Sequence, residues 1–417
     1  MNTRYRFALL VLVYATLLPF HSALAQFAQQ GPKLVGADYI GQPEQGDSVA
    51  ISADGNTAIV GGPQDGTSGA SWIWTRNGGF WTQQETKLVG SAGGGQGFAV
   101  AISADGNTAL VGVPYDDFTK GAVLVWTRNG VIWTQQGPKL VGSGSIGTSS
   151  VQGWSVALSA DGNTAIAGGV NDNGNIGAAW IWSRSGGVWT QQGTKLVGSG
   201  SIGSAGQGSS VSLSADGNTA IVGGYFDGSA GAAWVWTRSG GIWTQQGNKL
   251  VASDATEFAG QGGAVSLSAD GNTAIVGGFA DNNKVGAAWV WTRSGGVWTQ
   301  QGTKLVGSFA LGKAEQGASV GISADGNIAV VGGPTDNVNG GSLWVWTKSG
   351  GVWTQQGHKL QSNTNSNGQQ MGFSLALAGD GKTIIAGAPV DNQAVGSAFV
   401  FVTPVETVPP RRHAVRH

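Results

Sequence analysis

The chain contains no cysteine and only four histidines. The absence of cysteine excludes a disulfide framework, a thiolate nucleophile and a cysteine-linked lipid anchor. Outside the segment 1–25 the only histidines are His358, His413 and His417, too few and too dispersed for a zinc site. No metal, no cofactor and no catalytic residue is therefore expected.

Charged residues are also scarce, at 11% of the chain, while glycine reaches 74 residues. Low charge with abundant glycine is compatible with disorder, but disordered chains are also poor in aromatic and β-branched residues. This chain has 18 tryptophans and many valines and isoleucines, so it is expected to fold into a globular structure.

The N-terminal segment 1–25 resembles an export signal. Arg4 and Arg6 precede an apolar run from Phe7 to Phe20, and Ala23-Leu24-Ala25 forms a small-x-small cleavage site. The run is shorter than the roughly 20 residues of a membrane span. The pattern predicts a signal peptide over 1–25 and no membrane span after its removal; an uncleaved anchor is the alternative. The protein is then exported, to the cell surface, the extracellular space or a periplasm.

Removal of the segment 1–25 leaves 20 basic and 23 acidic side chains, a net charge of −3. A near-neutral surface gives no electrostatic attraction to nucleic acid. The one basic cluster follows Pro409-Pro410, and the segment 404–417 is predicted to be a disordered basic tail.

A repeat dominates the remaining sequence. Variants of Ser-Ala-Asp-Gly-Asn recur at nearly constant intervals, with the aspartate at 54, 105, 161, 216, 270, 325 and 380. Seven units with this spacing suit the blades of a β-propeller better than the shorter helical repeats.

Each repeat resolves into four strands, named a to d in chain order. In the unit around Asp216, strand a covers 210–214, strand b 219–222, strand c 232–237 and strand d begins at 242. Asp216-Gly217 and Ser239-Gly240 mark tight turns between strands. Alternating tryptophans in strand c show the period of two that is typical of a sheet. No sustained helical period is present.

The two ends of the repeat array are complementary. The strand d pattern, aromatic-x-Gln-Gln-x-x-Lys-Leu, occurs seven times, with its lysine at 33, 87, 139, 195, 249, 304 and 359. The first copy, 27–36, precedes any strand a, and the last unit lacks a strand d. The sequence therefore predicts an all-β, seven-bladed β-propeller over 26–403, with four antiparallel strands per blade and the N-terminal strand completing the last blade.

The repeat resembles the FG-GAP repeat of integrin-α-like β-propellers, in a bacterial variant. The family pattern of Phe-Gly-x-Ser-Val-Ala, Asp-Gly, Val-Gly-Ala-Pro and Gly-Ala-x-Tyr-Val-Phe corresponds in the first blade to 45–50, 54–55, 60–63 and 69–74. The leading phenylalanine is replaced by glutamine in six units and by Met371 in the last. The calcium loop of the family needs several carboxylates, whereas each turn here has one, so calcium binding is not carried over.

Three sets of repeated residues have both a structural and a functional interpretation. The tryptophans of strands c and d are expected to fill the spaces between blades, with ligand stacking as the alternative. The aspartates after strand b, at 65, 116, 172, 227, 281, 336 and 391, are expected to hydrogen-bond their own turns, with a cation or sugar contact as the alternative. The lysines of strand d are expected to protect the outer edge of each blade from aggregation.

The repeats differ from one another mainly in the d–a and b–c connections, which lie on one face of a propeller. We call this the variable face, and the face of the nearly identical a–b and c–d turns the constant face. The position before each strand a varies among Asp47, Phe98, Trp154, Ser209, Gly263, Ala318 and Phe373. Further aromatics occur in the b–c connections. Exposed aromatics on loops of a rigid scaffold are typical of a binding face, although neutral drift gives the same variability. The predicted ligand-binding or partner-binding residues are Phe98, Trp154, Phe373, Tyr115, Tyr225, Phe226 and Phe279.

The sequence thus predicts a monomeric, exported binding module for a protein or glycan ligand, and not an enzyme. A self-associating structural protein of the surface or matrix is the alternative. A carbohydrate-active enzyme is a third hypothesis, weakened by the presence of only five glutamates and by the location of the repeated aspartates in turns.

Overall fold

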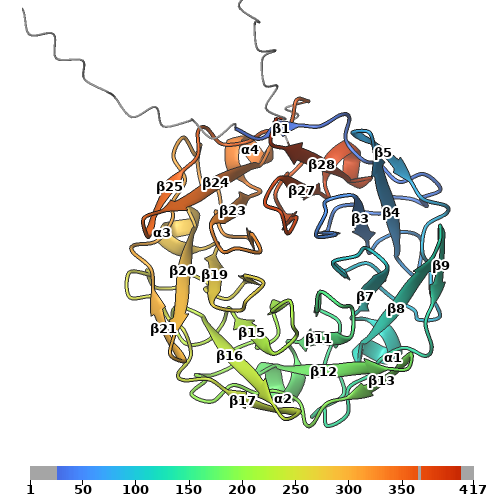
Figure 1. Ribbon diagram of the computed structural model, residues 1–417, viewed down its shortest axis with the longest axis horizontal. Helices are drawn as coiled ribbons and strands as arrows, with labels where there is room; N and C mark the ends of the chain where they lie inside the picture. The colour runs from blue at the N-terminus through green and yellow to red at the C-terminus, as the bar shows by residue number, and fades with distance from the viewer. Residues whose placement is uncertain (1–25, 365–367, 405–417) are drawn as a thin grey trace, which may run out of the picture.

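The computed structural model describes residues 26–364 and 368–404. The predicted signal peptide and all but the first residue of the predicted basic tail lie outside the described residues. The described chain forms seven four-stranded antiparallel sheets arranged as a ring around a central channel (Figure 1). The predicted seven-bladed β-propeller is confirmed.

The innermost strand of each blade, strand a, lines the channel. These strands are β2 (Ser48–Ile51), β6 (Ala99–Ile102), β10 (Ser155–Leu158), β14 (Val211–Leu213), β18 (Ala264–Leu267), β22 (Ser319–Ile322) and β26 (Ser374–Leu377). The second strand, strand b, is almost entirely buried, because strands and side chains of two blades enclose it. These strands are β3 (Thr57–Gly62), β7 (Thr108–Val113), β11 (Thr164–Gly169), β15 (Thr219–Gly224), β19 (Thr273–Gly278), β23 (Ile328–Gly333) and β27 (Thr383–Ala388).

The third strand, strand c, carries the repeated tryptophans. These strands are β4 (Ala70–Asn77), β8 (Ala122–Asn129), β12 (Ala178–Ser185), β16 (Ala232–Ser239), β20 (Ala287–Ser294), β24 (Ser342–Ser349) and β28 (Ser397–Val402). The outer strands are β5 (Phe80–Gln83), β9 (Ile132–Gln135), β13 (Val188–Gln191), β17 (Ile242–Gln245), β21 (Val297–Gln300), β25 (Val352–Gln355) and, for the last blade, β1 (Ala28–Gln29). The strand boundaries expected around Asp216 agree closely with β14 to β17.

Five of the b–c connections contain a short helical segment that the sequence did not reveal. These are α1 (Asp116–Thr119), α2 (Asp172–Asn175), α3 (Asp281–Lys284), α4 (Asp336–Asn339) and α5 (Asp391–Ala394). Each begins at the repeated aspartate and continues with residues at positive φ, such as Asn282, Asn283 and Lys284 at 48°, 56° and 70°. Asparagine tolerates this left-handed conformation better than most residues, which explains its frequency here. These segments are left-handed turns, so the expectation of no regular helix is consistent with the structure.

The N-terminal strand closes the ring as predicted. Ala28 and Gln29 of β1 pair with Val402 and Phe401 of β28, and Leu34 forms a further bridge to Ala398. Figure 1 shows β1 at the outer edge of the blade formed by the end of the chain. Phe27 is buried in the same cluster as Phe399 and Phe401. The first and last segments of the repeat array are therefore held together by backbone pairing and by burial.

Neighbouring blades are joined on both faces by backbone contacts. On the constant face the a–b turns form a closed circle of seven hydrogen bonds, from Ala53 N–H to Ala104 O onward, with N···O distances between 2.9 and 3.3 Å. On the variable face Gln45 N–H donates to Val395 O at 3.1 Å across the closing junction, and Ser374 Oγ donates to Gly46 O at 2.8 Å. Gly387 lies so close to Gly46 O that an added Cβ would be 1.9 Å from it. Glycine is required there because the blades approach so closely.

The tryptophans of strand c fill the space between blades, as expected. Trp234 is fully buried in a cluster with Ile166 and Ile181 of the preceding blade. Its indole Nε1 donates a 2.8 Å hydrogen bond to Ser199 O. The tryptophans of strand d lie nearer the surface, and five of them contact the arginine of the adjacent strand c, as in Arg238 over Trp243 at 5.3 Å. For the repeated tryptophans, the structure supports the role of filling the space between blades and not the alternative of stacking against a ligand.

The expected role of the repeated aspartates was wrong, and the repeated lysines have a role that was not expected. In each blade the lysine after strand d forms an ion pair with the aspartate after strand b, giving Lys33–Asp391, Lys87–Asp65, Lys139–Asp116, Lys195–Asp172, Lys249–Asp227, Lys304–Asp281 and Lys359–Asp336. The aspartate side chains are buried, and in six blades the other carboxylate oxygen accepts from a backbone N–H of the d–a connection. The carboxylates therefore fix a neighbouring connection and do not cap their own turns.

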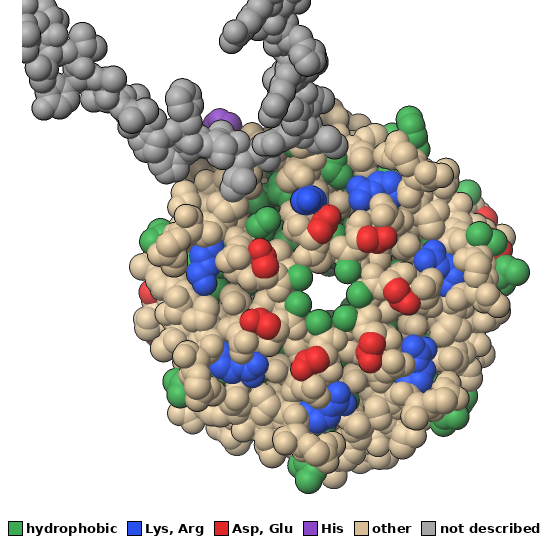
Figure 2. Space-filling model, in the orientation of Figure 1, with side chains coloured by type: hydrophobic (Ala, Val, Ile, Leu, Met, Phe, Trp, Pro, Cys, Tyr) green, Lys and Arg blue, Asp and Glu red, His purple; other side chains and the backbone are tan. Residues whose placement is uncertain are grey.

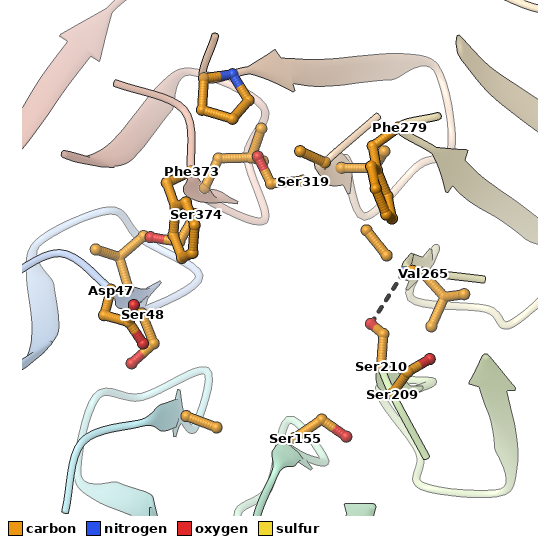
Figure 3. A pocket seen from close by; sticks show the side chains of 18 of the residues that line it. Asp47, Ser48, Ser155, Ser209, Ser210, Val265, Phe279, Ser319, Phe373 and Ser374 are labelled. Atoms are coloured by element: carbon orange, nitrogen blue, oxygen red, sulfur yellow. Dashed lines mark hydrogen bonds between the residues drawn. The ribbon is translucent and has the colours of Figure 1, made fainter. Parts of the chain in front are cut away.

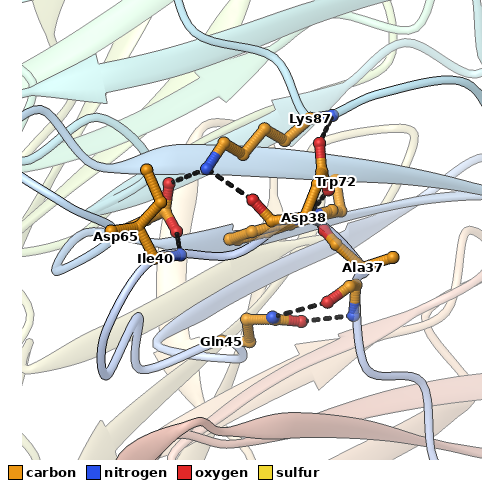
Figure 4. A network of polar contacts seen from close by, with 8 residues as sticks. Ala37, Asp38, Ile40, Gln45, Asp65, Trp72 and Lys87 are labelled. Atoms are coloured by element: carbon orange, nitrogen blue, oxygen red, sulfur yellow. Dashed lines mark hydrogen bonds and ion pairs between the residues drawn. The ribbon is translucent and has the colours of Figure 1, made fainter.

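A second buried polar side chain holds the same connection. In the first blade Gln45 accepts from Gly36 N–H at 2.5 Å and donates to Gly36 O at 3.1 Å. Figure 4 shows the two hydrogen bonds of Gln45 beside the network of Lys87, Asp65 and Ile40. The d–a connections are thereby rigid supports for the residues that they carry on the variable face.

Replacing Lys195 by methionine is expected to destabilise the protein by about 1–3 kcal/mol, because the buried Asp172 carboxylate loses its cation. The side chain of Asp172 is fully buried, whereas Lys195 is 12% exposed. Urea unfolding of Lys195→Met measures the loss, and Lys382→Met, which removes an exposed lysine, is the matched control. Equal midpoints for the two variants would contradict a stabilising role for the ion pair.

Candidate functional site

A cavity of about 750 Å³ lies at the centre of the variable face. The seven variable residues that precede the strands a all line it: Asp47, Phe98, Trp154, Ser209, Gly263, Ala318 and Phe373. Each follows a glycine with φ between 85° and 89°, a conformation that only glycine adopts without strain. The repeated glycine thus turns one residue from every blade toward the same space.

Aromatic side chains form two groups around this cavity. In the first, Phe98 contacts Trp154 at 4.6 Å and Tyr115 at 5.9 Å between ring centroids. In the second, Tyr225 contacts Phe226 at 3.9 Å and Phe279 at 6.4 Å. Phe373 lies next to Asp47 in the order of blades, and Figure 3 shows both on one side of the cavity, with Phe279 on the other.

The structure brings most of the residues singled out from the sequence into one place. Phe98, Trp154, Tyr225, Phe279 and Phe373 line the central cavity. Tyr115 does not line it but packs edge-on against Phe98. Phe226 lines a second cavity of about 640 Å³, which Trp154 and Tyr225 share with the central one. Phe118, another loop aromatic, is 93% exposed and lines neither.

Sequence reasoning missed two contributors. Asp47 belonged to the variable positions but was not among the expected site residues, because its role depends on the burial that the closed ring imposes. Ile202 is 61% exposed and lines the second cavity beside Phe226. The segment Gly-Ser-Gly-Ser-Ile-Gly that contains it has an identical copy around Ile146. This repetition was the signal in the sequence that could have identified Ile202 as a candidate.

Asp47 is the most perturbed acid of the variable face. Burial at the cavity wall raises the pKa of its carboxyl to about 7, and the negative charge of the nearby Glu44 contributes to the rise. The same carboxylate contributes, after burial, to a raised pKa of Tyr115. Among the described residues no side chain donates a hydrogen bond to Asp47, so its carboxyl group lies at the cavity without a partner.

Replacing Asp47 by asparagine is expected to stabilise the protein at pH 8 and to have little effect at pH 4. Since the pKa of Asp47 is higher in the folded state, its ionisation opposes folding: the penalty is absent below about pH 4, grows as pH rises, and is complete above about pH 7. The gain at pH 8 is at most about 4 kcal/mol. Chemical unfolding at both pH values measures it; an equal effect at pH 4 and pH 8 would contradict the raised pKa.

The constant face has a different electrostatic character. Figure 2 shows acidic side chains around the central opening and basic side chains farther out on this face. The acids belong to the a–b turns. Burial raises the pKa of Asp216, but hydrogen bonds from Ser214 and from the backbone and side chain of Asn218 outweigh it and hold the pKa below its usual value. The same pattern recurs in five other blades. These carboxylates are ionised and are already used to build their turns.

Within residues 26–364 and 368–404, no three histidine, cysteine, aspartate or glutamate side chains lie together in a way that could hold a metal ion. No helix in this part of the chain has the length and apolar character of a membrane span.

No family model matches the chain, and no curated protein matches it. The likeness to FG-GAP repeats therefore stays a prediction. Among solved structures, hydrazine synthase of Kuenenia stuttgartiensis is similar, with a TM-score of 0.52 and 14% sequence identity over 86% of this chain and 95% of that chain. At such low identity the likeness concerns the β-propeller fold alone.

Proposed function

We propose that the protein is an exported, non-catalytic binding module that recognises a protein or glycan ligand through its variable face. One observation carries the proposal: five aromatic residues from five different blades line a single cavity at the centre of that face. Aromatic side chains that are held rigidly in a concave surface are typical of binding sites.

The surrounding structure supports this proposal. The ion pairs and glutamine clamps fix the d–a connections, so the cavity is formed before a ligand arrives. Preorganised sites lose less conformational entropy on binding. The cavity contains carboxyl groups at Asp47 and Glu315, but Glu315 is paired with Lys284 at 2.8 Å. This arrangement offers a binding surface more readily than a pair of cooperating catalytic acids.

A screen of the exported chain on a glycan array, together with a pull-down from cell-surface proteins, tests the proposal. The double variant Phe98→Ala, Trp154→Ala is tested in parallel with the wild type and is expected to lose the ligand. Its free energy of unfolding should change little, since both side chains are partly exposed and substitutions at such sites are usually worth about 0.5 kcal/mol. If the folded double variant retained the ligand, the binding site would have to lie outside the central cavity.

The alternative is a structural protein that associates with itself. Several apolar side chains of the variable face, including Phe118, Val338 and Phe258, are more than 70% exposed and would favour self-association. Size-exclusion chromatography over a wide concentration range distinguishes the two functions. A binding module is expected to elute as a monomer at every concentration, whereas concentration-dependent growth would favour the alternative.

A further inference from the structure

We propose that the central cavity binds an organic cation, an ammonium or guanidinium group, with Asp47 as its counter-ion and the neighbouring aromatic rings as its walls. This inference rests on the proposed function, because it assigns a ligand chemistry to the same cavity.

The lack of an internal partner for Asp47 is the first observation. The aspartates that are fully buried beneath the variable face are each paired with a lysine, as Asp65 is with Lys87. Asp47 has no such lysine, and no described side chain donates a hydrogen bond to it. A carboxylate that is partly removed from water is stabilised most effectively by a positive charge. The missing partner is therefore expected to come from a ligand.

The charges around Asp47 also favour a cationic ligand. The titratable groups near it are Glu44 and the Tyr115 hydroxyl, and Glu315 lines the same cavity from another blade. Glu315 is already neutralised by Lys284. Among the described residues no lysine or arginine lines the cavity. An anionic ligand would meet only negative and neutral groups, whereas a cation would meet an uncompensated carboxyl.

The aromatic walls select an organic cation over a metal ion. In the order of blades Asp47 lies between Phe373 and Phe98, and Phe98 is supported by Trp154 and Tyr115. The faces of such rings attract ammonium and guanidinium groups. Calcium or magnesium would need about six oxygen ligands, which these side chains do not provide. The volume of about 750 Å³ leaves room for a charged group together with the chain that carries it.

Binding of a cation is expected to depend on pH. The raised pKa of Asp47 leaves much of the carboxyl protonated near neutrality. A cation favours the ionised form, so binding releases a proton and strengthens as pH rises from 5.5 to 8. A site built from aromatic rings alone would show no such dependence.

Isothermal titration calorimetry with small probes tests the inference. Tetramethylammonium and N-acetylarginine amide represent the two kinds of cation, and tert-butyl alcohol is a neutral compound of similar shape to the first. At pH 8 at least one cation should bind about tenfold or more tightly than the alcohol. Its affinity should fall about thirtyfold at pH 5.5, because a carboxyl with a pKa of about 7 is almost fully protonated there. Comparison of the two cations shows which headgroup the cavity prefers.

The variant Asp47→Asn should lose the cation, while Glu257→Gln, which removes an exposed charge outside the cavity on the same face, should retain it. Unfolding at pH 8 verifies that Asp47→Asn is folded. Failure of both cations to bind, or equal binding to wild type and Asp47→Asn, would overturn the inference. If Asp47→Asn retained the ligand found in the screen while Phe98→Ala, Trp154→Ala lost it, the proposal of a cationic ligand would be wrong, but the proposed binding function would stand. Retention by both variants would overturn the proposed function as well.

Discussion

Deletion of residues 27–35 is expected to lower the thermal unfolding temperature by about 10 °C and to produce oligomers. The segment supplies the outer strand of the last blade, buries Phe27 and Leu34, and provides Lys33 to the buried Asp391. Loss of two large buried side chains alone costs about 5–10 kcal/mol. The exposed edge of β28 would then be free to pair with another chain. Calorimetry and light scattering measure the two effects.

A relocated strand provides the matched control for this deletion. In the other six blades a tight turn joins strand c to strand d, so the same connection can be built at the end of the last blade. A variant lacking residues 27–35 at its N-terminus would carry residues 26–36 after Val402, joined by a copy of 348–351. Because Ala28 pairs with Val402 as Thr354 pairs with Thr347, the register is preserved. Recovery of stability is expected; a deletion variant as stable and monomeric as wild type would contradict closure by this strand.

Replacement of Trp234 by alanine is expected to cost about 3–5 kcal/mol. The side chain is fully buried between two blades, packs against Gly198 and donates a hydrogen bond to Ser199 O. The neighbouring side chains cannot move to fill the space of the ring, because the blades are joined by backbone contacts on both faces. For a chain of this length the unfolding temperature should fall by about 5 °C.

Phe80→Ala is the control for Trp234→Ala, because Phe80 is also a strand aromatic but is 78% exposed. Its free energy of unfolding should stay within about 0.5 kcal/mol of wild type. Denaturant unfolding of both variants separates the roles of interblade and exposed aromatics. A cost below about 1 kcal/mol for Trp234→Ala would mean that the blades are held together mainly by their backbone contacts.

The fold was predictable because the sequence patterns that indicate it recur at regular intervals. Seven copies of one turn indicated the number of blades, and the separated strand d at Phe27 indicated how the ring closes. What the repeat could not reveal is which recurrent side chains meet. Lys87 and Asp65 are distant in the chain, and the register of their strands brings them together only in the folded blade. Each residue type had a plausible local role, so the sequence alone favoured the local interpretations.

The candidate site was predictable in part for a similar reason. Variation at one position of the repeat identified Phe98, Trp154 and Phe373 as residues of one face. Their convergence on a cavity depends on the closed ring and on the glycine before each of them. The chemistry of Asp47 depends on burial and on Glu44, neither of which a pattern of residue types contains.

Hydrogen–deuterium exchange of the propeller, with and without the ligand obtained from the screen, tests the central claim most directly, because it reports which face the ligand covers. Protection is expected in the d–a connections before Phe98, Trp154 and Phe373 and in the b–c connection at Tyr225. The a–b turns, such as 214–218, should exchange at the same rate in both states. Protection confined to those turns, with the connections around the central cavity unchanged, would contradict a binding site on the variable face.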